Sequence, residues 1–406
     1  MSLSDLTSIP DSAQRQRLAS PSTISSGSGT GSLTLAFQEP GGDDTIFRIY
    51  LMDESVRQLK FGSGRTTRAS DILSNILRIL KVDDKSAPLF ALWMVGDDLQ
   101  LQLKANHEPV VLREQWTKML ERFCAAAPTE SPKLVLKRDA FVLKAMERKV
   151  RDEMTLELLF DEARYNVIYS KYPASVDDCC YLAGILLQLF VLESPASTGE
   201  EIIRTKLARL VPEEQINSLK EDEWRTRILK AHQPHGKNPK NILYLLYLQY
   251  VWQWPFYGAT FFGGEYRPLT QGVVVGDANL TQVRVGVNAE SLVIINDNTN
   301  EIEHKFEFHE ISWDSVAKDG RNYFLIEFGP DKDPETIVIV SPMAQLMDSM
   351  VTRAVEEANR RQELLLTTRL NQGGPQDMPV ASIETGLSQA DRFRKPKFRS
   401  LKKIFL

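Results

Sequence analysis

Residues 241–262, NILYLLYLQYVWQWPFYGATFF, constrain the fold of this chain more than any other segment. An apolar pattern typical of a buried helix runs from Ile242 to Trp252. It breaks at Pro255, which lacks the amide donor that a helix interior needs. A β-rich run, YGATFF, follows at once. The pattern predicts that a helical domain meets a β domain with almost no linker, and therefore with a fixed mutual orientation.

Length and charge limit the class of protein. A chain of 406 residues suggests two to four domains, and a net charge of −5 does not suggest a general nucleic-acid binder. The first residues show no basic region followed by an apolar stretch, so no secretory signal is expected. The longest apolar run is too short to span a bilayer. Three unpatterned cysteines indicate a reducing compartment, so we expect a cytoplasmic protein.

The chain is expected to be disordered at both ends. Residues 1–43 are rich in Ser, Gly, Thr and Pro, and such a segment cannot bury enough surface to offset its ordering entropy. Its SSGSGTGS stretch has no Lys-Ser/Thr ending and no flanking strand and helix, so we interpret it as a linker and not as a phosphate loop. Residues 366–406 are expected to form a disordered tail with a basic and hydrophobic end.

Residues 44–138 have the pattern of a ubiquitin-like lobe. Two strand-like runs precede an apolar helix stripe that Ser70 can cap, and a buried strand, FALWMV, follows with a hairpin partner. Residues 149–255 are helical, and Ser175 begins a capping box, Ser-Val-Asp-Asp. Residues 257–365 form strands, with an Asp319-Gly320 hairpin turn, and then one terminal helix, which is the order of a pleckstrin-homology or phosphotyrosine-binding lobe.

This three-part order resembles the FERM-domain family. The resemblance covers roughly 44–365 and is strongest in YSKYPASVDDCCYLAGILLQ, residues 169–188, and in Pro-Phe-Tyr-Gly at the junction. It implies an α+β multidomain cloverleaf of a ubiquitin-like lobe, an acyl-CoA-binding-protein-like helical lobe and a PH/PTB-like lobe. It also implies a monomeric adaptor that holds cytoplasmic tails of membrane proteins. The implied partners include inactive rhomboid proteins, which control a cell-surface metalloprotease sheddase, and a Wnt co-receptor.

We find no catalytic or metal-binding pattern in the sequence. His232 and His235 lie in a Pro-Gly loop without Cys or carboxylate at metal-ligand spacing. Cys179 and Cys180 fall on an apolar helix face, where small buried hydrophobes are expected. We therefore expect no catalytic residue, no cofactor and no metal, and a protein without enzymatic activity.

A phosphotyrosine-binding-type lobe suggests one candidate binding site. In such lobes an extended peptide adds to the edge of the fifth strand and packs against the terminal helix. The expected strand residues are Trp313, Asp314, Ser315, Val316 and Ala317, and the expected helix residues are Met343, Leu346, Met347 and Met350. Methionine adapts to varied apolar ligands. The alternative is that this helix stripe only plugs the end of the barrel.

The last sixteen residues, DRFRKPKFRSLKKIFL, suggest a second binding surface, because they carry seven basic residues against one acidic side chain. Basic and aromatic residues together favour an anionic membrane surface. The residues expected to contact the membrane are Arg392, Phe393, Arg394, Lys395, Lys397, Phe398, Arg399, Lys402 and Lys403. Intramolecular docking or nuclear import are the alternatives for this tail.

The sequence predicts a peripheral protein at the inner face of the plasma membrane or of endomembranes. Two other functions stay open. One is a membrane–cytoskeleton linker of the ezrin class, although the region after Leu365 is short for a coiled segment plus an actin-binding tail. The other is an enzyme whose site the sequence does not reveal.

Overall fold

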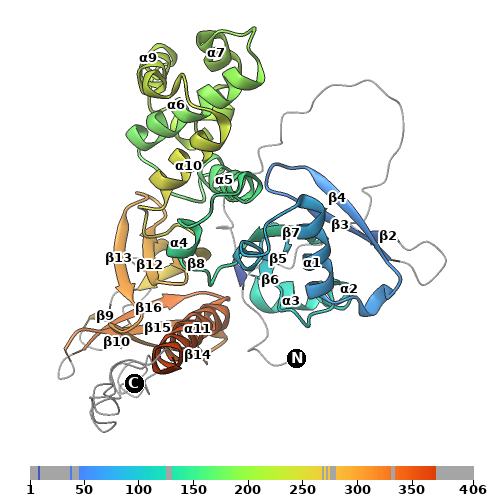
Figure 1. The fold of residues 1–406 in the computed structure, drawn as a ribbon. Coiled ribbons are helices and arrows are strands. Elements are labelled where there is room, and N and C mark those ends of the chain that lie inside the picture. The colour runs from blue at the N-terminus through green and yellow to red at the C-terminus, as the bar shows by residue number, and fades with distance from the viewer. Residues whose placement is uncertain are drawn as a thin grey trace, which may run out of the picture.

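The computed structural model describes residues 8–9, 37–38, 45–124, 130–267, 269–270, 273–274, 280–330 and 334–371. Their helices and strands form an N-terminal lobe (residues 45–138), a helical lobe (residues 144–251) and a C-terminal lobe (residues 260–371), shown in Figure 1. The α+β multidomain architecture expected from the sequence is confirmed.

A mixed sheet with helices on it forms the N-terminal lobe. The strand order is β1-β6-β5-β7-β3-β2, with β4 on the other side of β3, and only the β3–β7 pairing is parallel among the described strands. The elements are β1 (Ser8–Ile9), β2 (Phe37–Gln38), β3 (Thr45–Tyr50), β4 (Val56–Phe61), a 3-10 turn (Gly64–Thr66), α1 (Ala69–Leu80), a second 3-10 turn (Ala87–Leu89), β5 (Phe90–Val95), β6 (Gln100–Gln102), α2 (Pro109–Glu114), α3 (Trp116–Phe123) and β7 (Lys133–Arg138).

Two details of this lobe differ from the sequence prediction. α1 begins at Ala69 after Arg68, so Ser70 lies inside the helix and does not cap it. The two short strands β1 and β2 fall within residues 1–43, where disorder is predicted. Two residues are too few to show an alternating pattern, so the sequence could not reveal these strands. The other residues of that segment lie outside the described part of the chain.

In the helical lobe the predicted capping box is confirmed. The Ser175 side chain accepts a hydrogen bond from the backbone of Asp178, and the Asp178 side chain accepts one from the backbone of Ser175. This cap starts α6 at the centre of the lobe, where 11 of its 18 residues are buried. The elements are α4 (Lys144–Glu147), α5 (Glu153–Ile168), α6 (Val176–Glu193), α7 (Gly199–Leu210), α8 (Glu213–Ile216), α9 (Glu221–His232), a 3-10 turn (Gln233–His235) and α10 (Lys240–Val251).

The C-terminal lobe is an antiparallel sheet packed against one long helix. The strand order is β13-β12-β11-β8-β16-β15-β14, and β9 and β10 form a separate short hairpin. The elements are β8 (Thr260–Arg267), β9 (Leu269–Thr270), β10 (Val273–Val274), β11 (Thr281–Val287), β12 (Ser291–Asn296), β13 (Ile302–Glu307), β14 (Ile311–Lys318), β15 (Arg321–Phe328), β16 (Glu335–Val340) and α11 (Ala344–Asn371).

A buried charge network ties the three lobes together. Glu147 is fully buried, and its carboxylate accepts hydrogen bonds from Arg138 Nε (2.5 Å), Trp252 Nε1 (2.9 Å) and Tyr257 Oη (2.6 Å). Burial alone would lower the pKa of Arg138, but the Glu147 carboxylate outweighs this effect and raises it. The four side chains come from β7, from α4, from the residue after α10 and from the junction that leads into β8.

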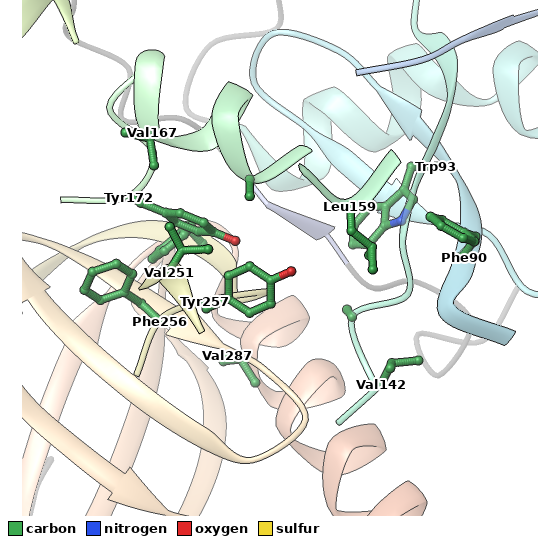
Figure 2. Packing of buried hydrophobic residues seen from close by; sticks show 14 of the residues in the cluster. Phe90, Trp93, Val142, Leu159, Val167, Tyr172, Val251, Phe256, Tyr257 and Val287 are labelled. Carbon is green, nitrogen blue, oxygen red and sulfur yellow. The ribbon is translucent and has the colours of Figure 1, made fainter. Parts of the chain in front are cut away.

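The Pro-Phe-Tyr-Gly motif lies beside this network. Tyr172 packs near Phe256 and Tyr257, with ring centroids 5.7 Å and 6.1 Å away, and the hydroxyl of Tyr172 accepts a hydrogen bond from the backbone of Gly258 (Figure 2). Gly258 has φ of +69°, and a Cβ there would lie 2.5 Å from Arg138 Nη1. Only glycine fits this position without moving the buried arginine.

A second tie joins the C-terminal lobe to the helical lobe. Arg284 on β11 is buried, and its Nη1 donates to the backbone carbonyls of Ser170 (3.1 Å) and Lys171 (3.2 Å). Its Nε lies 2.7 Å from Asp297 Oδ1 as an ion pair. Asn288 donates to the carbonyl of Pro255 at 2.8 Å. These contacts support a fixed arrangement of the lobes, which the short junction predicts.

Candidate functional site

β14 presents an open strand edge, since among the described strands it pairs with β15 alone. Asp319 and Gly320 connect the two strands with φ of 51° and 74°, and Lys318 pairs with Arg321 next to the turn. Positive φ at both central residues is typical of a type I′ hairpin, so the predicted turn is confirmed. A two-residue turn fixes the register of the whole β14–β15 ladder.

The ladder register and one side-chain contact show which amides face the open edge. The Ser315 amide donates to Asp314 Oδ1 at 2.8 Å, so it points away from β15. Amide direction alternates along a strand, so the amides of Trp313 and Ala317 point the same way. A peptide that adds to this edge would use these three amides, and it would first displace the Asp314 carboxylate from the Ser315 amide.

The helix residues of the predicted groove are buried, whereas a peptide-binding wall would have to be exposed. Met343 is 2 % exposed, and Leu346, Met347 and Met350 are 0 % exposed. These side chains belong to the core between α11 and the sheet, so they cannot form a methionine wall for a ligand unless the helix moves. Their buried positions agree with the alternative, in which the stripe plugs the end of the barrel. Trp313 is likewise 1 % exposed.

Polar side chains bridge the strand and the helix at the surface. Ser315 Oγ donates to Asp348 Oδ2 at 3.1 Å, and Trp313 Nε1 donates to Thr352 Oγ1 at 3.4 Å. Asp314, Val316 and Ala317 are partly or fully exposed. The accessible site is therefore a strand edge with a polar rim. Sequence reasoning missed Asp348 and Thr352, whose only sequence signal is their position one helical turn apart on α11.

The cysteines have no sign of nucleophilic reactivity. Burial, reinforced by nearby carboxylates, raises the pKa of Cys124 and of Cys179 to about 12. Burial also raises the pKa of Cys180 to about 11. A reactive cysteine needs a lowered pKa, because the thiolate is the nucleophile. The positions of Cys179 and Cys180 fit their predicted role as small core residues.

The two histidines expected in a loop lie at the end of α9 and in the 3-10 turn that follows it, and they pack in the helical lobe. His232 Nε2 lies 2.7 Å from Gln188 Oε1, and His235 is buried against Tyr181 with a centroid distance of 5.7 Å. Burial lowers the pKa of both histidines. Within the described ranges, no cluster of His, Cys, Asp and Glu has the arrangement to hold a metal ion.

A small cavity lies where the lobes meet. Its lining includes Arg138, Glu162, Tyr172, Thr260 and Arg284, and its volume is about 30 Å³. Pockets for small organic ligands are typically about 300–1,000 Å³. This cavity therefore fits water and not a substrate.

The predicted membrane-binding residues of the tail, Arg392 to Lys403, lie outside the described part of the chain. Across the described helices, none combines the length and apolar character needed to cross a bilayer.

Two family models match the chain in adjacent segments. The FERM central domain matches residues 145–262. The KRIT1/FRMD8 FERM domain C-lobe matches residues 281–350. The first segment covers the helical lobe and the junction, and the second contains β14 and the start of α11.

Curated relatives extend this similarity over most of the chain. FERM domain-containing protein 8 of Homo sapiens is 26% identical over an alignment of 392 positions, which covers 86% of this chain and 80% of that protein. The Xenopus tropicalis protein of the same name is 27% identical over an alignment of 340 positions, which covers 76% of this chain and 75% of that protein. FERM domain-containing protein B of Dictyostelium discoideum is 24% identical over 64% of this chain and 54% of its own.

Solved structures confirm the three-lobed fold. The human myosin 7b C-terminal MyTH4-FERM domain, in complex with the harmonin-a PDZ3 domain, superimposes with a TM-score of 0.58 at 15% identity. The match covers 78% of this chain and spans 60% of that one. The complex of the FERM and C-terminal domains of Drosophila Merlin gives a TM-score of 0.54 at 15% identity and covers 78% of this chain and 98% of that one.

Proposed function

We propose that this protein is a non-enzymatic adaptor for the cytoplasmic tails of transmembrane proteins. The chain has the FERM fold and the sequence signatures of FERM lobes. The observation that carries this proposal is the open edge of β14, whose outward amides can pair with an extended peptide. The fixed junction supports it, because a rigid scaffold presents one edge in one orientation to a membrane protein.

The first partners to test are the cytoplasmic segments of an inactive rhomboid protein and of a Wnt co-receptor, which the FERM resemblance implies. Backbone pairing gives affinity, while alternate side chains of the peptide give specificity. Because the rim carries hydroxyl and carboxylate groups, the peptide would make polar contacts there and not insert apolar anchors.

The edge itself can be tested with one substitution. Ala317→Pro removes an outward amide without removing a bond to β15, since proline is tolerated where the N–H faces outward. Losing one or two backbone hydrogen bonds should weaken peptide binding about tenfold or more. Isothermal titration with the two purified cytoplasmic segments measures this loss, and Ala317→Ser, which keeps the amide, is the matched control. Equal affinity of both variants would rule out the β14 edge as the docking site.

The Asp314 carboxylate offers the opposite test. Asp314→Ala frees the Ser315 amide for an incoming strand, so affinity for the same segments should rise. A fall in affinity would mean that Asp314 contacts the partner directly, and the edge proposal would then need a different register.

We infer further that the basic and aromatic tail brings the adaptor to anionic membranes. Each basic residue near such a leaflet contributes about 1 kcal/mol. Liposome co-sedimentation should show binding of the full chain at 0.1 M salt and less at 1 M, where the Debye length falls from about 10 Å to about 3 Å. Replacing the basic residues from Arg392 to Lys403 by Gln should abolish it. Unchanged binding of that variant would place the membrane contact elsewhere.

A further inference from the structure

The sheet of the C-terminal lobe has a second open edge, which is formed by β13. Among the described strands, β13 pairs with β12 alone, and it lies at the opposite end of the strand order from β14. Figure 1 shows β13 at the outer margin of the lobe, on the side away from the N-terminal lobe. Ile302 on this strand is 41 % exposed. The unpaired backbone groups of β13 are therefore accessible to a further strand.

A side-chain contact shows which amides of β13 face outward. The Glu307 amide donates to Glu310 Oε2 at 2.7 Å, so it points away from β12. Amide direction alternates along a strand, so the Lys305 amide points the same way. A strand that adds to this edge would use these two amides, and it would first displace the Glu310 carboxylate from the Glu307 amide.

The exposed side chains along this edge are mainly acidic. Carboxylates are exposed at Glu301, Glu303, Glu307 and Glu310, and Lys305 is the only lysine or arginine from 301 to 310. Within the described part of the chain, none of these carboxylates forms an ion pair with a lysine or an arginine. Two copies of this edge would bring like charges opposite each other, which is unfavourable. The charge therefore favours a basic strand over a second copy of the same edge.

An aromatic cluster adjoins the acidic edge. The ring centroids of His304 and Phe306 on β13 are 5.5 Å apart, and Phe328 on β15 lies 5.9 Å from His304 and 4.9 Å from Phe306. Tyr266 on β8 lies 6.3 Å from His304. The rings of Tyr266, His304 and Phe328 are half-buried, so each keeps some open surface. Lysine and arginine pack on such rings through their apolar stems and their charge.

We propose that the β13 edge binds an extended basic segment of a partner protein as an added strand. Successive side chains of a strand point to opposite faces. Basic side chains on one face of the added strand would meet the carboxylates of the edge, and those on the other face would meet the aromatic cluster. This docking does not depend on the β14 edge, because the two edges lie at opposite ends of the sheet order.

Protection against aggregation is the simpler explanation for a charged edge. Natural edge strands carry charges and bulges that prevent pairing, and the β12–β13 register shifts between Ile294 and Ile295. Protection works with charges of either sign. The nearly uniform negative charge and the adjoining aromatic rings go beyond it, because they select one kind of strand.

The charge of the site can be tested with the full chain and a fluorescein-labelled peptide of alternating lysine and valine. Fluorescence anisotropy at about 0.1 M salt should show binding of this peptide, and a peptide of alternating glutamate and valine should not bind. A variant with Glu301→Lys, Glu303→Lys and Glu307→Lys together should bind the basic peptide at least about tenfold more weakly. Absence of binding to the parent would mean that β13 is only a protected edge, and it would overturn the proposal.

The matched control makes the same change of charge at the start of α9. It carries Glu221→Lys, Asp222→Lys and Glu223→Lys at three exposed positions, and its affinity should change less than about twofold. Equal losses in the two variants would mean that the peptide responds to net charge alone, and they would reject the β13 site.

Lys305→Pro and Lys305→Thr separate backbone pairing from charge. Both remove the lysine, but only proline removes the outward amide, and proline is tolerated where the N–H faces away from the neighbouring strand. The proline variant should bind the basic peptide about tenfold more weakly than the threonine variant, and equal affinities would reject strand addition. Replacing the basic residues from Arg392 to Lys403 by Gln should leave affinity unchanged. A clear rise would show that the tail of the chain covers this edge, and it would overturn the assignment to a partner protein.

Discussion

The three-lobe junction and the β14 edge both depend on polar groups, but they hold them in opposite ways. At the junction, Glu147 has no exposed surface and accepts bonds from donors on three parts of the chain. At the edge, the Ser315 amide is held by its neighbour Asp314, and the strand has no second partner strand in the described chain.

The two regions differ in whether their polar groups can still pair with a partner from outside. Enclosed and mutually satisfied groups fix one arrangement of the lobes, and removing any of them leaves another buried and unpaired. Groups on a strand edge can exchange a local partner for an external one at low cost. The junction therefore fixes the arrangement of the lobes. The edge keeps backbone groups that can pair with the proposed peptide.

The largest effect should come from Glu147→Ala. The substitution leaves the Arg138 charge buried without its carboxylate and removes the acceptor for Trp252 and Tyr257, so we expect a loss of about 3–5 kcal/mol in the free energy of unfolding. Chemical denaturation measures it. Glu114→Ala, which breaks an exposed ion pair with Arg65, should cost less than about 1 kcal/mol. Similar losses for the two variants would contradict the contrast between enclosed and exposed charges.

Met350→Ala tests whether the helix stripe is core or ligand surface. Because Met350 is fully buried, we expect a loss of about 2–5 kcal/mol in stability, with peptide affinity unchanged for the fraction that stays folded. Leu364→Ala, at a 61 % exposed position on the same helix, should change stability by less than about 0.5 kcal/mol. A stable Met350→Ala protein that no longer binds peptide would show that Met350 is part of the binding site.

Asp161 on α5 is a half-buried carboxylate, and within the described part of the chain it does not have the three donors that Glu147 has. Burial raises its pKa to about 7, with Arg164 lowering it and Asp53 and Glu157 raising it. A raised pKa in the folded state means that stability is present at low pH and is lost as the pH rises through about 7. Asp161→Asn should therefore raise the melting temperature at pH 8 relative to the parent, and less at pH 5. A gain that does not depend on pH would show that its charge is not the cause.

Apart from the two control substitutions, the smallest effect on stability should come from Ser315→Ala. It removes the hydrogen bond to Asp348 at the rim, which contributes about 1 kcal/mol, and leaves the backbone amide in place. We expect a small loss in the free energy of unfolding and retained peptide binding by titration calorimetry. A loss of several kcal/mol would show that this rim stabilises the fold, as the junction does, and would contradict the difference between the two regions.

Local signals in the sequence predicted much of the fold. Ser175 and Asp178 are three residues apart, and that spacing is enough to form the capping box. Asp319-Gly320 supplies the two positive φ angles of the hairpin without any distant contact. Ser70 failed as a cap because the N-cap of α1 is Arg68, two positions earlier, and local propensity cannot specify this start.

The candidate site was only half predictable. Alternation and strand order place Trp313 to Ala317 on an edge, and the structure retains that edge as the proposed docking site. The apolar stripe with Met343 and Met350 has the same sequence pattern whether it faces a peptide or the sheet. The periodicity of a helix shows which side is apolar, but it does not show what covers that side.

The sequence by itself determined the order of the lobes, the tight junction at Pro255 and the identity of the buried faces, because these depend on periodicity and on residues that act locally. Only the tertiary structure decided that Arg138, Glu147, Trp252 and Tyr257 meet, that Gly258 lies against the arginine, and that β14 is left with a free edge. Such meetings join residues up to 120 positions apart, from Arg138 to Gly258, and no local pattern records them. They follow from packing three lobes around one shared centre, where every buried polar group needs a partner.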